Sequence, residues 1–206
     1  MFTNAVQPTI IERDQAGQRW HVILMLMSFL LALLAGCGSN RVMQPTTAPG
    51  PAVIAVESQL LETVTNPRLH VGDPAPDFAY TLADGSTHTL RDLRGQKVLI
   101  NFWATWCAPC EVEMPDLERA AQQLGDTGLV VLAVNHSEQV DVIERFAQKL
   151  GVTFPLIANP DRDIIQGFGV INLPTSYFID TDGIVSYKHI GLMNFDFIKQ
   201  RVEEMQ

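Results

Sequence analysis

Two cysteines, Cys107 and Cys110, are separated by two residues and follow an apolar run that is typical of a buried strand. A strand that leads into Cys-x-x-Cys at the start of a helix suits thiol–disulfide exchange better than metal binding. The first cysteine would lie at the helix N-terminus, where free N–H groups and the helix dipole favour a thiolate. The second would lie on the same helix face and could attack a mixed disulfide formed by the first. The pair therefore predicts redox exchange.

The length and composition limit the number of domains and the kinds of partner. The chain has 206 residues, which is enough for one domain with a proper core plus extensions. Acidic residues outnumber basic ones by 23 to 14, which gives a formal net charge of −9. This balance argues against nucleic acid as a partner and against electrostatic docking on anionic lipid.

An uncharged apolar segment, residues 22–35, precedes the third cysteine, Cys37. With about 14 residues it is shorter than a membrane-spanning helix requires, and it matches the apolar part of a signal peptide. Leu34-Ala35-Gly36-Cys37 resembles the bacterial lipobox, in which the cysteine receives lipid and becomes the mature N-terminus. We therefore expect a lipoprotein-type signal peptide at 1–36 and lipid attachment at Cys37. The alternative is an uncleaved anchor; either way the catalytic domain lies outside the cytoplasm, on a bacterial membrane.

The region between Cys37 and the folded domain has the composition of a linker. Residues 38–51 are rich in Gly, Pro, Ser and Thr, whereas residues 53–64 fit either a strand or a short helix. We expect residues 37–70 to form the lipid anchor and a flexible tether, and the domain to occupy residues 71–206.

Within that domain the periodicity predicts alternating strands and helices. A hairpin is expected at residues 77–90 around Asp84-Gly85, because Asp-Gly is a strong turn signal. The expected elements that follow are a strand at 97–103, a helix from Cys107 to Gly125, a strand at 129–134, a helix ending before Gly151, a short helix at 161–167, strands at 176–179 and 184–189, and a helix from about Asn194. This order predicts an α/β fold with a central mixed sheet flanked by helices and an added N-terminal β-hairpin.

Four motifs together resemble one protein family. They are Val71-Gly72-Asp73-Pro74-Ala75-Pro76-Asp77-Phe78, the run from Leu93-Arg94-Gly95 to Trp106, Cys107-Ala108-Pro109-Cys110, and Leu173-Pro174-Thr175. The chain resembles the thioredoxin superfamily and, within it, the TlpA/ResA-like membrane-tethered thiol–disulfide oxidoreductases with a redoxin (AhpC/TSA-like) domain. The first motif is shared with peroxiredoxins, so it does not settle the activity.

The resemblance implies roles for several residues. Cys107 would be the exposed nucleophile and Cys110 the more buried resolving thiol of a redox-active disulfide. A cis peptide bond between Leu173 and Pro174 would place the proline loop opposite the cysteines, and Trp106 would flank the reactive sulfur on an exposed apolar face. Such a reaction requires no cofactor and no metal.

Glu113 lies three residues after Cys110 and therefore on the same helix face. TlpA/ResA-like proteins often have a glutamate there, and cytoplasmic thioredoxins carry an aspartate where this chain has Asn101. One hypothesis is that Glu113 takes the Cys110 proton, or raises the thiol pKa values by its own charge. The competing interpretation is a solvated surface carboxylate.

Two other activities fit these residues less well. Peroxiredoxins place a proline and a hydroxyl residue before the reactive cysteine, and these positions hold Ile100 and Ala104 here. A zinc module would need a second pair of ligands, and the chain has a single Cys-x-x-Cys.

The direction of electron flow is the open point, because an oxidase and a reductase can share the motif. The resemblance favours a reductase of cysteine-containing client proteins, such as apocytochrome c, that is kept reduced by a membrane thiol electron donor. A disulfide-forming oxidase and a thiol peroxidase remain the alternatives.

Overall fold

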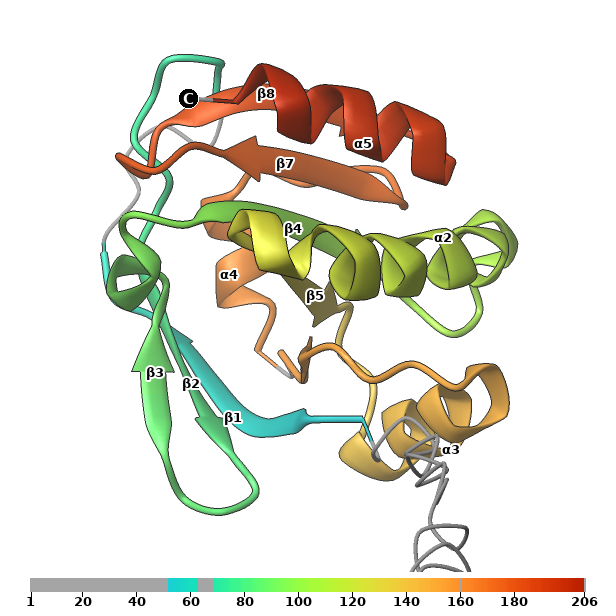
Figure 1. Ribbon diagram of the computed structural model, residues 1–206. Coiled ribbons are helices and arrows are strands. Elements are labelled where there is room, and N and C mark those ends of the chain that lie inside the picture. The colour runs from blue at the N-terminus through green and yellow to red at the C-terminus, as the bar shows by residue number, and fades with distance from the viewer. Residues whose placement is uncertain (1–51, 63–68, 160, 206) are drawn as a thin grey trace, which may run out of the picture. The chain divides into compact units, whose positions relative to one another are not determined.

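The computed structural model describes residues 52–62, 69–159 and 161–205. These residues contain an eight-stranded sheet with the strand order β3-β2-β1-β6-β5-β4-β7-β8 (Figure 1). The strands are β1 (Ile54–Leu60), β2 (Phe78–Leu82), β3 (Thr87–Thr89), β4 (Lys97–Trp103), β5 (Leu129–Asn135), β6 (Leu156–Ile157), β7 (Thr175–Ile179) and β8 (Val185–Ile190). The pairs β1–β6, β6–β5 and β5–β4 are parallel and the others antiparallel, so the mixed sheet is confirmed.

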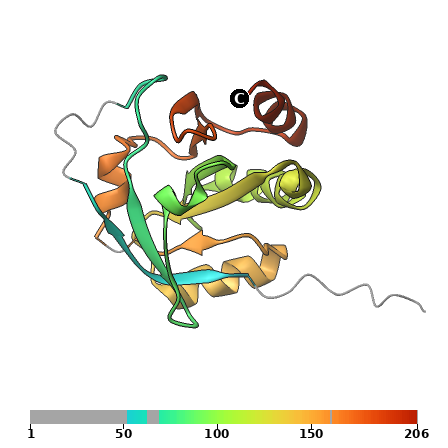
Figure 2. The same cartoon turned by 60° about the vertical axis from the view of Figure 1, so that its left-hand side comes forward.

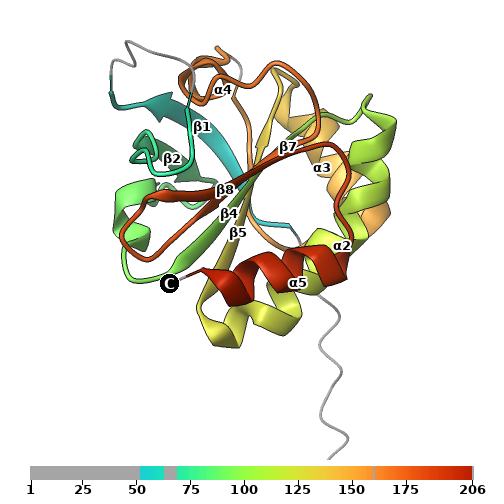
Figure 3. The same cartoon turned by 90° about the horizontal axis from the view of Figure 1, so that it is seen from above.

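Helices cover both faces of this sheet (Figure 3). They are α2 (Ala108–Leu124), α3 (Val140–Leu150), α4 (Asp163–Gly167) and α5 (Phe195–Glu204), with 3-10 turns η1 (Leu90–Leu93) and η2 (Gly125–Thr127). Side chains of α2, α3 and α5 share one apolar cluster, and those of α4 and η1 share the other. α3 ends where Gly151 adopts a left-handed conformation with φ 67°, as glycine does readily at helix C-termini.

The central strand β4 supplies both cores because its residues alternate between the two faces. Leu99 and Trp103 pack under α2 and α3, and Ile100 and Phe102 pack on the side of α4. All four are fully buried, as expected for a strand covered on both faces. Asn101 shares the face of Leu99 and Trp103, so its polar side chain points into the core beneath α2.

The predicted start of the domain at residue 71 is wrong. Strand β1 lies inside the sheet, pairing with β2 on one side and with β6 on the other (Figure 2). Its residues Ile54 and Ala55 are buried, which ties this segment to the core. The folded domain therefore includes β1, and the expected tether cannot extend to residue 70. The expected signal peptide at 1–36 and the lipid attachment site Cys37 lie outside the described residues. Within the described residues no helix has the length and apolar character needed to cross a membrane.

Candidate active site

Four segments of the chain meet at one edge of the sheet. The parallel strands β4 and β5 end together, with Trp103 opposite Asn135. Strand β7 runs antiparallel to β4 and begins at the same edge, where Thr175 pairs with Phe102. Thr175 also pairs with Ile190 at the end of β8. The β4–α2 loop, the β5–α3 loop, the loop before β7 and the loop after β8 are thereby brought around one point, as the carboxyl ends of parallel strands often are.

The cysteine pair occupies the centre of this edge. Cys107 is the N-cap of α2 and Cys110 lies in its first turn, and a disulfide bond joins their sulfur atoms. The Cys107 carbonyl accepts the N–H groups of Cys110 and Glu111 at 3.0 and 3.1 Å, which fixes the first turn. Cys107 is 5% exposed and Cys110 1%, so Cys107 is less exposed in the disulfide form than expected.

A groove of about 420 Å³ opens beside Cys107, and Cys110 does not line it. Its lining residues are Trp106, Cys107, Ala108, Pro109, His136, Val170, Ile171, Asn172 and Leu173. Trp106 is 66% and Ile171 92% exposed, and none of the described residues that line the groove is Asp, Glu, Lys or Arg. Single exposed apolar side chains are common on protein surfaces, but exposed apolar side chains that gather in one groove, as Trp106 and Ile171 do, mark a place where another molecule can bind. The groove suits an apolar stretch of polypeptide.

The proline loop forms the wall of the groove. The Leu173–Pro174 peptide bond is cis, as the resemblance implied. Pro174 itself is buried, and its carbonyl accepts the N–H of Gly191 at 2.8 Å, which joins this loop to the one after β8. Leu173 remains on the groove side.

Glu113 is fully buried, so its interpretation as a solvated surface carboxylate is wrong. Its Oε1 accepts the backbone N–H of Met193 at 3.1 Å, and its Oε2 accepts the Asn101 side-chain amide at 3.2 Å. Burial raises the pKa of the Glu113 carboxyl to about 7, while these two donors lower it and the charge of Asp116 adds a small increase. A carboxyl with this pKa exchanges its proton near neutral pH.

Glu138, in the β5–α3 loop, belongs to the site but is not among the residues predicted from the sequence. Its carboxylate accepts the backbone N–H of Thr105 at 2.7 Å, the Thr105 hydroxyl, and the Asn135 side-chain amide at 2.8 Å. Thr105 lies two residues before Cys107, so Glu138 holds the loop that carries the first cysteine. The neighbouring His136 lines the groove, with its ring 6.0 Å from that of Trp106. The sequence did contain an indication of Glu138 and His136, because polar residues directly after a buried parallel strand often lie at a functional site.

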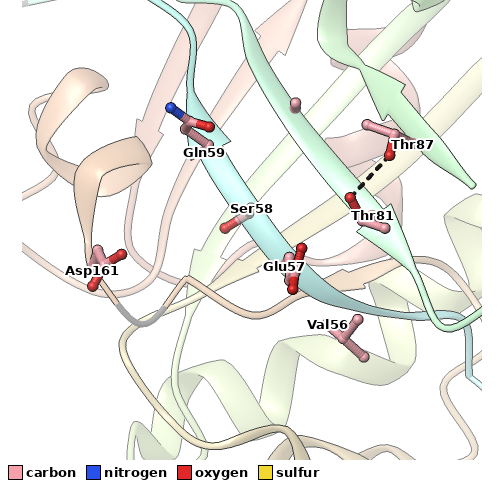
Figure 4. A pocket seen from close by; sticks show the side chains of 8 residues that line it. Val56, Glu57, Ser58, Gln59, Thr81, Thr87 and Asp161 are labelled. Atoms are coloured by element: carbon pink, nitrogen blue, oxygen red, sulfur yellow. Dashed lines mark hydrogen bonds between the residues drawn. The ribbon is translucent and has the colours of Figure 1, made fainter. Parts of the chain in front are cut away.

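A second hollow of about 380 Å³ lies on the outer part of the sheet (Figure 4). Polar side chains from β1, β2 and β3 line it, including Ser58, Thr81 and Thr87, and the Thr81 and Thr87 hydroxyls are 3.1 Å apart. None of the described residues that line it is a cysteine or histidine, so they offer no counterpart to the cysteine pair. In the part of the chain that the structure describes, no three His, Cys, Asp or Glu residues cluster as metal ligands would.

The positions that a peroxiredoxin uses for peroxide activation are apolar here. Ile100 and Ala104 are both fully buried, Ile100 within β4 and Ala104 directly after it. Neither can offer a hydroxyl to a peroxide bound at Cys107. The geometry around the cysteines therefore fits disulfide exchange with a polypeptide better than reduction of a peroxide.

Comparison with known proteins places the chain in one family. Residues 71–188 match the model of the AhpC/TSA family. Thiol-disulfide oxidoreductase ResA of Geobacillus thermodenitrificans is 39% identical over 136 residues, which cover 66% of this chain and 78% of that protein.

Two solved structures share the fold and part of the sequence. An exposed lipoprotein thioredoxin from Streptococcus pneumoniae has a TM-score of 0.56 and 31% identity, covering 63% of this chain and 99% of that one. A thiol:disulfide interchange protein of the thioredoxin family from Chlorobium tepidum has a TM-score of 0.59 and 26% identity, covering 66% of this chain and 97% of that one. The chain belongs to the AhpC/TSA family and is a thiol–disulfide oxidoreductase of the ResA type with a thioredoxin-like fold.

Proposed function

We propose that this protein reduces disulfide bonds in client proteins on the extracytoplasmic side of a bacterial membrane. The observation that carries the proposal is the Cys107–Cys110 disulfide beside an uncharged groove that Cys107 lines and Cys110 does not. A client disulfide placed in that groove meets Cys107 first. The exposed Trp106 and Ile171 would hold the apolar residues around the client cysteine.

The first step uses Cys107 as the nucleophile. In the reduced protein, the Cys107 thiolate attacks one sulfur of the client disulfide and forms a mixed disulfide, and the other client sulfur leaves as a thiolate. The position of Cys107 at the N-terminus of α2 favours its thiolate, because the free N–H groups there carry partial positive charge.

The second step uses Cys110 as the resolving thiol. Glu113, one helical turn further along α2, accepts the Cys110 proton, and the resulting thiolate attacks the Cys107 sulfur. This forms the Cys107–Cys110 disulfide and releases the second client thiolate. The two electrons of the protein dithiol have then passed to the client, and an external thiol donor must restore the dithiol.

The proposed site of action rests on the N-terminal segment. Lipid attachment at Cys37 would keep the domain at the membrane, within reach of a membrane thiol donor and of secreted clients such as apocytochrome c. Support comes from the lipobox-like Leu34-Ala35-Gly36-Cys37 and from the similarity to a lipoprotein thioredoxin. Labelling with a radioactive fatty acid in cells tests this, with Cys37→Ser as the variant that should lose the label.

The direction of transfer is tested by the reduction potential of the Cys107–Cys110 couple. A value near that of thioredoxin, about −270 mV, supports a reductase, whereas a value near about −120 mV would make the protein an oxidant that forms disulfides. Cys110→Ser should accumulate a mixed disulfide with a client, and Cys107→Ser should not. Consumption of hydrogen peroxide by the wild type at a rate comparable to disulfide reduction would support the peroxidase instead.

A further inference from the structure

Three polar side chains from three elements meet in the core behind the cysteine pair. Asn101 comes from β4, Glu113 from α2 and Ser176 from β7, and all three are completely buried. Asn101 and Ser176 are directly opposite each other in the antiparallel pair β4–β7. The Asn101 Nδ2 atom lies 3.2 Å from Glu113 Oε2 and 2.9 Å from Ser176 Oγ, so one amide nitrogen serves both neighbours.

The other end of this amide, Asn101 Oδ1, is buried and makes no hydrogen bond within the described residues. A buried acceptor without a donor costs about 1–3 kcal/mol. A half-turn of the amide exchanges Oδ1 and Nδ2, and Oδ1 would then face both Glu113 Oε2 and Ser176 Oγ. Two oxygens can share that contact only when a proton lies between them. This alternative orientation therefore requires a protonated Glu113.

We propose that Asn101 is a positioning residue that serves both protonation states of Glu113 by turning its side-chain amide over. With Glu113 ionised, Nδ2 donates to the carboxylate, as in the structure. With Glu113 protonated, the carboxyl O–H donates to Oδ1 and the Ser176 hydroxyl reverses to donate to Oδ1 as well. The inference rests on the proposed role of Glu113 as acceptor of the Cys110 proton, and it explains how the core accommodates that proton.

The proton balance of the step is complete without another group. The proton leaves the Cys110 sulfur, binds Glu113 Oε2 and is then shared with Asn101 Oδ1. The Met193 N–H continues to donate to Oε1 in both states. On α2 the ionisable neighbours are Asp116, whose charge opposes ionisation of Glu113, and the two cysteines when reduced. Within the described residues, the groups that hydrogen-bond to Glu113 from β4 and from the loop after β8 are the neutral Asn101 amide and the Met193 N–H. The neutral Ser176 hydroxyl on β7 contacts Asn101.

The neutrality of Asn101 is what the arrangement needs. An aspartate at this position would place a second ionisable carboxyl about 3 Å from Glu113, and the two would titrate as a coupled pair. A leucine would offer no donor to the ionised form and no acceptor to the protonated form. An amide provides one of each without adding charge.

The test is a pH titration of the full, disulfide-bonded chain by NMR, because the cysteines do not titrate in that state. The Glu113 carboxyl is followed by its ¹³C resonance, which Glu113→Gln identifies by its loss, and the Asn101 side-chain amide by its ¹H and ¹⁵N resonances. We expect the Asn101 amide resonances to shift with the same midpoint as Glu113, and this shift to vanish in Glu113→Gln. An Asn101 amide that stays unchanged while Glu113 titrates would overturn the proposal.

Two variants sharpen the test. Asn101→Leu removes the donor to the carboxylate and should raise the Glu113 midpoint by about one pH unit or more. Ser176→Ala keeps the contact between amide and carboxyl and is the matched control, with a smaller change expected. An unchanged midpoint in a folded Asn101→Leu would also count against the proposal. These titrations use the oxidised protein and no client. A negative result would therefore overturn the role of Asn101 without affecting the proposed disulfide reductase activity, and loss of the reductase proposal would leave the titration result unchanged.

Discussion

Two glutamates flank the same cysteine pair, and the structure places them in opposite situations. Glu113, on α2, is fully buried and has two donors, one from Met193 and one from Asn101. Glu138, in the β5–α3 loop, is half-buried, and three donors from Thr105 and Asn135 already point at its carboxylate. A buried carboxyl with few donors can bind a proton. A carboxylate that accepts several hydrogen bonds from a loop holds that loop in place, and we call Glu138 with its donors Thr105 and Asn135 the clamp. Proximity to a reactive cysteine therefore does not assign a role to a carboxylate; its donors and its burial do.

The largest expected effect of this difference is on stability as a function of pH. The pKa of Glu113 is raised from 4.5 to about 7 in the folded protein, so folding favours its protonated form. This stabilisation is fully present below pH 4.5 and is lost as the pH rises through about 7. At 1.36 kcal/mol per pKa unit, the shift corresponds to about 3 kcal/mol.

Chemical unfolding of the oxidised protein between pH 4 and pH 8 measures this effect. Glu113→Gln lacks the titrating group, so the difference in unfolding free energy between wild type and variant should change by about 3 kcal/mol over this range. Glu138→Gln is the matched control on the other side of the cysteines. A difference between wild type and Glu113→Gln that does not vary with pH would contradict the assignment.

The next effect concerns the resolving step. If Glu113 accepts the Cys110 proton as proposed, Glu113→Gln removes that acceptor. We then expect release of the second client thiol from the mixed disulfide to slow about 100-fold at pH 7, which is the low end of general-base contributions. Rapid-quench measurement of mixed-disulfide decay isolates this step from binding. The slowing should shrink at higher pH, where hydroxide removes the proton. Equal decay rates in both proteins across the pH range would mean that Glu113 takes no part.

Removing the clamp should act mainly on binding and on local stability. Glu138→Ala leaves the Thr105 N–H and the Asn135 amide without their acceptor, which should lower the free energy of unfolding by about 2 kcal/mol. Because Trp106 follows Thr105 directly, the groove should become less well defined. We expect KM for a client disulfide to rise about fivefold, about 1 kcal/mol, with a smaller change in kcat.

Glu138→Gln keeps one acceptor oxygen and should restore part of both losses. If Glu138→Ala instead lowered kcat at constant KM, Glu138 would take part in the chemical step. The distinction between a proton-binding Glu113 and a loop-holding Glu138 would then be wrong.

The contrast also shows how far the sequence alone could lead. Residues 97–103 were predicted as a strand and form β4 at those same positions, because an uninterrupted apolar run has few alternatives. Placement of Glu113 on the cysteine face of α2 followed from helical spacing. Its burial did not, because Met193, eighty residues later, covers it. A contact of that range depends on the return of β8 to the same sheet edge, which local patterns do not encode.

The same limit explains the wrong domain boundary. Strand β1 pairs with β6, so Ile54 lies beside Leu156, about a hundred residues away in sequence. Only two of its seven residues are buried, so the segment lacks the regular alternation of apolar and polar residues that predicts a strand. Glu138 was missed for a related reason, since its partner Thr105 comes from a different loop.

The smallest expected effect separates the two hydrogen bonds that Thr105 donates to Glu138. Thr105→Val removes the hydroxyl that donates to Glu138 and keeps the backbone N–H that donates at 2.7 Å, so about 1 kcal/mol of stability should be lost. Thr105→Ser retains the hydroxyl and should stay close to wild type. In a Glu138→Ala background, Thr105→Val should cost almost nothing, because its partner is already absent. If the stability losses of Thr105→Val and Glu138→Ala were additive in the double variant, the Thr105 hydroxyl would stabilise the loop through another contact. Glu138 would then hold Thr105 through the backbone N–H alone.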